Sequence, residues 1–127
     1  MDITARYLNL ARAEQWNDAL PLIERIVAQA PAVPTSWHNY GVCLDALGRH
    51  AEAAEAFKRA CRTGGDDGTL YRAFRSLALA KDEDGFLRFL DEQSLKRSGL
   101  FALLDTDDVF AEIRESYFYD ELKRTRG

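Results

Sequence analysis

Two apolar stripes at helical spacing, separated by a short break, constrain the fold of this chain more than any other feature. The first stripe lies on one helix face and contains Trp37, Tyr40, Gly41 and Leu44. Glycine weakens a helix interior by about 1 kcal/mol relative to alanine, so Gly41 indicates a close approach by a neighbouring helix. Gly48 can end the helix in the left-handed conformation. The second stripe follows it and contains Ala53, Phe57 and Ala60, so the spacing predicts an antiparallel helix hairpin.

The pattern recurs in both directions, as it must if one hairpin cannot bury its own apolar face. At a period of about 34 residues, the second stripe maps back onto Ala19, Ile23 and Ile26. The same step forward carries the aromatic stripe to Tyr71 and Phe74, but Arg75 replaces the glycine. The first helix of the earliest repeat is degraded. We predict two clear repeats and one divergent repeat, over residues 1–33, 34–67 and 68–93.

The residues after Gln93 are too apolar to remain unpacked, and we interpret them as helices that cap the array. Asp107 and Asp108 precede helical apolar spacing, where the N-terminus of a helix favours negative charge, and Asp105 or Thr106 is the expected cap. Asp82-Glu83-Asp84 is interpreted in the same way. The capping helices are predicted over 94–124, and the whole chain, 1–127, as one domain of all-α class.

The central hairpin resembles the tetratricopeptide repeat, whose pattern is W-x2-L-G-x2-Y followed by A-x3-F. Its positions are occupied here by Trp37, Tyr40, Gly41, Leu44, Ala53 and Phe57. The resemblance implies a right-handed superhelical array of antiparallel hairpins, with about three repeats and a helical cap. The ending is similar to an acidic-x-x-Phe helix pair that is often seen in small bacterial tetratricopeptide proteins.

Composition and the absence of motifs exclude several classes of function. A formal net charge of -4 disfavours a general nucleic-acid binder, which needs a basic surface. The start of the chain shows neither a secretory signal nor a membrane span, so we expect a cytoplasmic protein. Cys43 and Cys61 are expected to be reduced thiols, and no metal or catalytic motif is recognisable. We therefore predict neither an enzyme nor a cofactor.

The resemblance implies that the first helix of each repeat lines a concave groove that holds a peptide or a helix of a partner protein. The predicted groove residues are Leu8, Arg12, Thr35, His38, Asn39, Val42, Asp45, Thr69, Arg72 and Ser76, with Thr4, Ala11 and Ala73 beside them. Arginines at these positions can pair with an acidic group, and Asn39 and His38 can bond an extended backbone. The alternative is that these are ordinary solvated side chains.

Two hypotheses of different classes follow for the function. The first is a scaffold or adaptor that binds a segment of another protein in the groove. The second is a structural protein that associates with itself through its terminal repeats or its aromatic tail, because an apolar end face must be covered. The aromatic residues expected to take part are Tyr7, Phe101, Tyr117 and Tyr119.

Overall fold

The computed structural model of the chain describes residues 2–126. Over these residues the regular structure is helical, without a strand, and successive helices pack in adjacent pairs, which confirms the predicted all-α class. The chain divides after Ser76 into two compact units. We call residues up to Ser76 the N-terminal unit and residues from Leu77 the C-terminal unit. The repeat boundaries given above stay a prediction.

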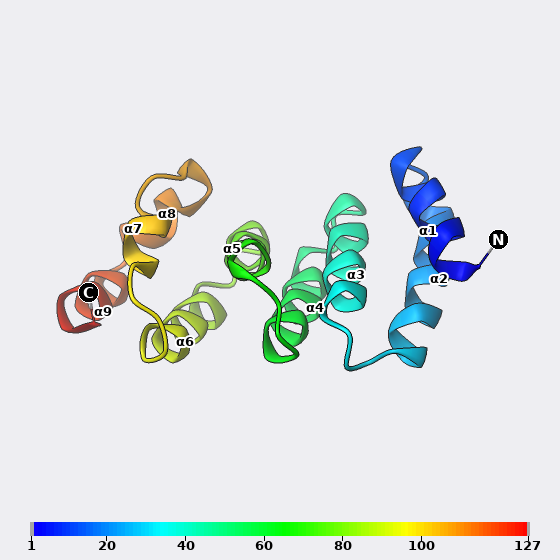
Figure 1. The fold of residues 1–127 in the computed structure, drawn as a ribbon. Helices are drawn as coiled ribbons and strands as arrows, with labels where there is room; N and C mark the ends of the chain where they lie inside the picture. The colour runs from blue at the N-terminus through cyan, green and yellow to red at the C-terminus, as the bar shows by residue number, and fades with distance from the viewer. Residues whose placement is uncertain (1, 127) are drawn as a thin grey trace. The chain divides into compact units, whose positions relative to one another are not determined.

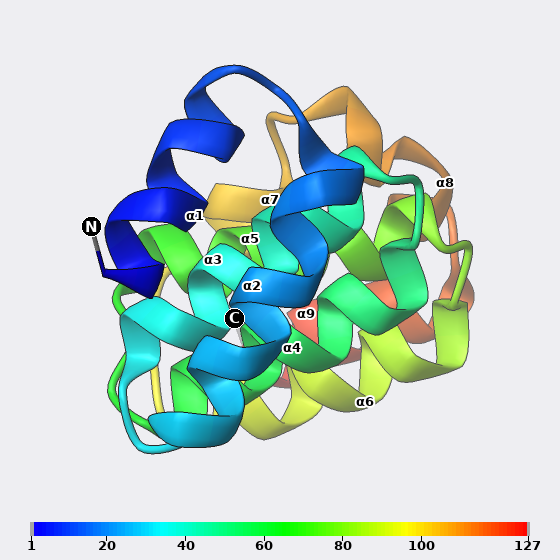
Figure 2. The ribbon, with the colours of Figure 1, turned by 90° about the vertical axis from the view of Figure 1, so that its right-hand side faces the viewer.

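The N-terminal unit is built from two complete helix hairpins and most of a fifth helix. Its helices are α1 (Ile3–Arg12), α2 (Trp16–Gln29), α3 (Pro34–Ala46), α4 (His50–Arg62) and α5 (Asp67–Leu79), of which α5 continues past Ser76. Figures 1 and 2 show that α3 lies between α2 and α4, and α3 is in contact with both. The sequence segment that predicted a hairpin is therefore the α3–α4 pair.

Local sequence signals account for where these helices begin and end. Asp2 caps α1, because its side chain accepts a hydrogen bond of 2.8 Å from the Ala5 amide. Pro34 occupies the first turn of α3, where its missing amide proton is not needed. Gly48 has a φ of 76° and joins α3 to α4, which confirms the predicted left-handed turn.

The close approach predicted at Gly41 is present. A β-carbon added at Gly41 would lie 2.7 Å from the ring of Phe57, and Phe57 is fully buried. The remaining core of this unit contains residues of both predicted stripes, counterparts of the stripes and adjoining apolar residues, namely Tyr7, Ala19, Ile23, Ile26, Val27, Cys43, Leu44, Ala53, Ala54, Ala56, Ala60, Leu70, Ala73 and Phe74. The two stripes therefore pack against each other as the spacing predicted.

The C-terminal unit contains one long helix followed by shorter ones. Its elements after α5 are α6 (Glu83–Ser94), α7 (Leu100–Leu104), the 3-10 helix η1 (Asp108–Phe110), α8 (Ala111–Arg114) and α9 (Tyr117–Arg126). Asp82 caps α6 by accepting from the Gly85 amide at 2.9 Å. Glu83 and Asp84 lie in its first turn, which confirms the helix-terminal interpretation of these acids.

The cap of the following element is one or two residues later than predicted. Asp107, and not Asp105 or Thr106, caps η1 by accepting from the Val109 amide at 3.0 Å. Asp105 instead accepts from the Tyr119 hydroxyl at 2.8 Å and from the Lys123 ammonium at 2.6 Å. The carboxylate of Asp105 thus fixes α9 against the end of α7.

The aromatic residues expected at open end faces are mostly core residues. Tyr7, Phe101 and Tyr119 are buried, and the rings of Phe101 and Tyr119 meet edge to face at 5.6 Å. Tyr117 is 68% exposed, and its neighbour Phe118 is 64% exposed. The exposed aromatic surface of the tail is therefore the Tyr117–Phe118 pair.

Candidate partner-binding face

Helices α3 and α5 are joined side by side by two polar contacts. His38 Nδ1 lies 2.9 Å from Thr69 Oγ1, and Ser76 Oγ donates to Asp45 Oδ2 at 2.7 Å. Both contacts join residues that are 31 positions apart. The two contacts lie about two helical turns apart along α3. Because both join residues with the same sequence separation, α3 and this part of α5 run parallel in a fixed register.

A third contact joins α1 to the same surface. The Tyr7 hydroxyl donates to the backbone carbonyl of Asn39 at 3.0 Å. The first helices of successive hairpins are thus bonded to one another, α1 to α3 and α3 to α5. We call the surface formed by α1, α3 and α5 as far as Ser76 the first-helix face.

At the N-terminal end of α3, His38 belongs to a chain of hydrogen bonds that fixes its tautomer. Asp66 Oδ1 accepts from the Thr69 amide at 3.0 Å and from the Thr69 hydroxyl at 3.3 Å. Since the hydroxyl proton is directed to Asp66, Thr69 Oγ1 accepts from His38 Nδ1–H, an assignment that rests on the network. The Nε2 atom of His38 is then an acceptor.

The pKa of His38 is lowered from its ordinary value. Burial of the ring is the main cause, and the nearby positive charge of Arg72 acts in the same direction, whereas Asp66 opposes both. The ring also meets that of Phe57 edge on, at 5.4 Å between centroids. His38 is therefore a neutral hydrogen-bonding group at neutral pH.

At the other end of the face, the arrangement of polar groups does not suit nucleophilic catalysis. Asp45 lies between His50 and Ser76, with Oδ1 2.8 Å from His50 Nδ1 and Oδ2 accepting from the Ser76 hydroxyl. A serine nucleophile needs the histidine, and not the carboxylate, as its direct partner. Ser76 is moreover fully buried. The Asp45 carboxylate acts here as a bridge between helices.

The structure places the predicted groove residues in three different environments. Thr69 and Ser76 are buried, as is Ala73, so their side chains are not accessible to a partner, contrary to the prediction. Partly exposed positions are Leu8, Ala11, His38, Asn39, Val42, Asp45 and Arg72. Exposed positions are Thr4, Arg12 and Thr35. Leu8 also packs against the core cluster around Tyr7 and Ile23.

A small pocket lies at the His38 end of the face. It has a volume of about 300 Å³ and is lined by Pro34, Thr35, His38, Gly64, Gly65, Asp66 and Thr69. The Gly64–Gly68 run is absent from the site predicted from the sequence, although its first residues line this pocket. The glycine run was the available signal, because it folds the backbone closely against the end of α4: a β-carbon at Gly65 would lie 2.9 Å from the Ala60 carbonyl oxygen.

Other reactive groups of the described residues have structural roles. Burial, with the charge of Glu24, raises the pKa of the Cys43 thiol to about 11. Its sulfur lies 3.5 Å from the Trp16 carbonyl oxygen, to which the thiol donates. Over residues 2–126, no group of three or more histidines, cysteines or acids is arranged to hold a metal ion. Within the same range no helix has the length and apolar character that crossing a bilayer requires.

The lowered pKa of His38 predicts how the stability of the fold depends on pH. Below pH of about 6.5 the unfolded chain takes up a proton at this ring that the folded chain does not. The contribution of His38 is thus fully present above that pH and is lost as pH falls through the lower folded-state pKa. Urea midpoints measured from pH 7.5 to 5.5 should decline for the natural chain and decline less for His38→Gln. A decline of equal size in His38→Gln contradicts the assignment, and His50→Gln is the matched control.

Comparison with known proteins places this surface in a family context. A family model described as tetratricopeptide repeat matches residues 5–68. The matched range contains α2, α3 and α4 complete, with most of α1 and the start of α5. No curated protein and no solved structure matches the chain.

Proposed function

The chain belongs to the tetratricopeptide repeat family, and we propose that it is an adaptor that binds a peptide or helix of a partner protein on the first-helix face. Repeats of this family generally mediate contacts between proteins and generally form non-catalytic scaffolds. A cytoplasmic location, expected from the sequence, is part of the proposal.

The observation that carries the proposal is the bonding of α1, α3 and α5 into one surface. Hydrogen bonds from Tyr7 to Asn39 and between α3 and α5 fix these helices before any partner arrives. A surface held in this way loses little conformational entropy on binding, which favours affinity. Its outward positions remain at least partly exposed, whereas Gly41, Cys43 and Leu44 of α3 are buried.

The chemistry of the exposed positions indicates what kind of segment would bind. Arg72 and Arg12 carry positive charge that can pair with an acidic side chain or a terminal carboxylate. His38 Nε2 can accept from the backbone amide of an extended peptide, and the Asn39 amide can both donate and accept. Val42 lies one turn further along α3 than these two residues, is partly exposed and can add an apolar contact. We propose a partner segment with an acidic group beside an apolar residue.

Reversing the charge of Arg72 should weaken capture of partners. Arg72→Glu repels an acidic group that the natural arginine attracts, and loss of a charge-assisted bond typically costs about 1.5–3 kcal/mol, or roughly tenfold or more in affinity. Asn39→Ala should give a smaller loss. Both are measured by affinity capture from the native cell, followed by titration of the captured protein.

The control for this experiment is Arg62→Glu, the same charge reversal at an exposed position of the second helix α4. It should leave capture unchanged. If Arg72→Glu and Asn39→Ala keep the folded circular dichroism spectrum and still capture the same partners as the natural chain, the first-helix face is not the binding surface.

Self-association is the second candidate function, and the exposure of Tyr117 and Phe118 favours it. These side chains are 68% and 64% exposed and adjacent, with their rings 5.6 Å apart. Exposed aromatic pairs are unusual on a surface without a partner. A second copy of the chain is one way to cover them.

A further inference from the structure

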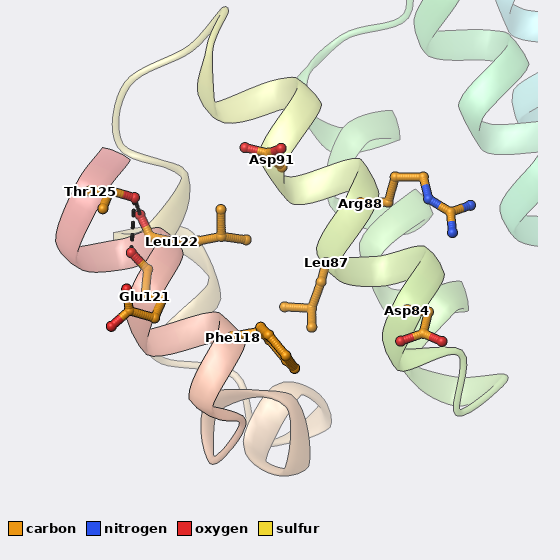
Figure 3. A pocket seen from close by; sticks show the side chains of 8 residues that line it. All are labelled: Asp84, Leu87, Arg88, Asp91, Phe118, Glu121, Leu122 and Thr125. Carbon is orange, nitrogen blue, oxygen red and sulfur yellow. Dashed lines mark hydrogen bonds between the residues drawn. The ribbon is translucent and has the colours of Figure 1, made fainter.

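The C-terminal unit contains an apolar groove between α6 and α9. Its volume is about 420 Å³. Figure 3 shows Leu87 of α6 and Phe118 and Leu122 of α9 directed into the space between the two helices. Leu87 is nearly buried, whereas Phe118 is largely exposed. The floor of the groove is therefore apolar and open on one side.

Charged residues line the α6 edge of this groove in an alternating order. Asp84, Arg88 and Asp91 follow one another at spacings of four and three, so they lie along one helix face with signs minus, plus, minus. On the opposite edge, Glu121 is already paired with Arg124 at 2.7 Å. The α6 edge thus provides the distinctive charge pattern.

Asp91 shows which chemistry this edge accepts. Its Oδ1 atom is shielded from solvent and forms an ion pair with the Arg126 guanidinium at 3.0 Å. The Asp91 side chain as a whole is 47% exposed, so the rest of the carboxylate is open to a donor from outside. A cationic group of the same chain already lies at this position, and a second cationic group would be favourable here.

A second copy of this chain matches the same pattern less completely. In a two-fold dimer the same surface meets itself, so antiparallel α6 edges centred on Arg88 would place Arg88 against Arg88. Asp84 would then face Asp91 of the other copy, and like charges held together repel. A shifted register pairs Arg88 with Asp84 or Asp91 of the other copy, but it leaves the third charge of each edge outside these pairs. An occupant of different sequence fits the edge better.

We propose that the groove between α6 and α9 binds an amphipathic helix of another protein, separate from the segment bound on the first-helix face. The apolar residues of that helix contact Leu87, Phe118 and Leu122. Its edge carries a basic, an acidic and a basic residue at i, i+4 and i+7, opposite Asp84, Arg88 and Asp91. The order of the charge signs, plus, minus, plus, is the same in both directions along the helix. Either orientation of the helix therefore places opposite charges against the α6 edge.

The probe for a test is a synthetic peptide of about 15 residues, a length at which a helix is marginally stable by itself. It carries leucines at i, i+3 and i+7 on an alanine background, with Lys, Glu and Lys along the neighbouring edge. A second peptide has Glu, Lys and Glu instead. Fluorescence anisotropy at low salt should show the first peptide binding at least tenfold more tightly to the full chain, because reversal turns attractive pairs into repulsive ones.

Variants of the chain locate the binding. Phe118→Ser should weaken the binding of the first peptide at least tenfold. Leu95→Ser should change the affinity for this peptide by less than twofold, because Leu95 is 66% exposed but does not line the groove. Arg88→Glu should make a peptide with three lysines the preferred probe. Circular dichroism checks that each variant is folded. Because Arg88 is exposed, Arg88→Glu provides a test that does not depend on Phe118.

The proposal is overturned if neither peptide binds, if both bind equally, or if folded Phe118→Ser binds as the natural chain does. A dimer seen by sedimentation equilibrium and abolished by Phe118→Ser would assign the groove to a second copy and overturn it as well. None of these outcomes concerns Arg72 or Asn39, so failure here is distinguishable from failure of the first-helix face.

Discussion

Phe57→Ala is expected to lower the free energy of unfolding of the N-terminal unit by about 3–5 kcal/mol, the usual cost of removing a buried phenylalanine ring. The ring is fully buried between α3 and α4, against Gly41 and beside the His38 ring at 5.4 Å. Its loss leaves a cavity that the small side chains of the second stripe cannot fill. A loss of this size is a large part of the stability of a typical domain.

Urea unfolding followed by tryptophan fluorescence measures this effect, because Trp16 and Trp37 both lie in the N-terminal unit. Phe118→Ala is the matched control: it makes the same truncation at a position that is 64% exposed, where a change within about 0.5 kcal/mol is expected. Equal losses in Phe57→Ala and Phe118→Ala would falsify the packing assigned to the hairpin.

The α3–α4 hairpin could be predicted from the sequence because each of its signals acts locally. Gly48 determines its own left-handed turn, and the stripe with Gly41 identifies the face that another helix must approach. Helical spacing then selects Phe57 as the residue opposite. These features depend on residues that are close in sequence, so no knowledge of other hairpins is needed.

Contacts between successive hairpins could not be predicted in the same way. Spacing shows which face of a helix carries Thr69 and Ser76, but it does not show how far α3 covers that face. The polar contacts of α3 with α5 join residues 31 apart, whereas the sequence repeat is about 34. This offset brings His38 and Asp45 against Thr69 and Ser76 and removes the two hydroxyls from the predicted groove surface.

The aromatic tail illustrates the same difficulty at the level of single residues. Tyr117, Phe118 and Tyr119 are consecutive, and each step along a helix turns the side chain by about 100°. Tyr119 is the buried one, where its ring packs against Phe101 and its hydroxyl donates to Asp105, which lies 14 positions away in sequence. The sequence showed that aromatic residues gather here, but the exposed pair and the groove beneath Phe118 are apparent only in the structure.

Gly41→Val is expected to lower the free energy of unfolding of the N-terminal unit by about 1–3 kcal/mol, although valine is the better helix former of the two. Three atoms of the Phe57 ring lie within 2.8 Å of the position that a β-carbon would take. The ring is fully buried, so it cannot move into solvent to make room. The same urea titration with tryptophan fluorescence measures the loss.

A double-mutant cycle tests whether the clash with Phe57 is the cause. In a Phe57→Ala background the ring is absent, and Gly41→Val should then be neutral or stabilising, because its side chain enters the space that the ring occupied. The two losses should therefore be strongly non-additive. Gly48→Val provides the control, because Gly48 has open space around it but a φ of 76°. Any loss of stability in Gly48→Val comes from backbone strain and should persist in the Phe57→Ala background. Additive losses for Gly41→Val and Phe57→Ala would show that the glycine is required for a reason other than the approach of this ring.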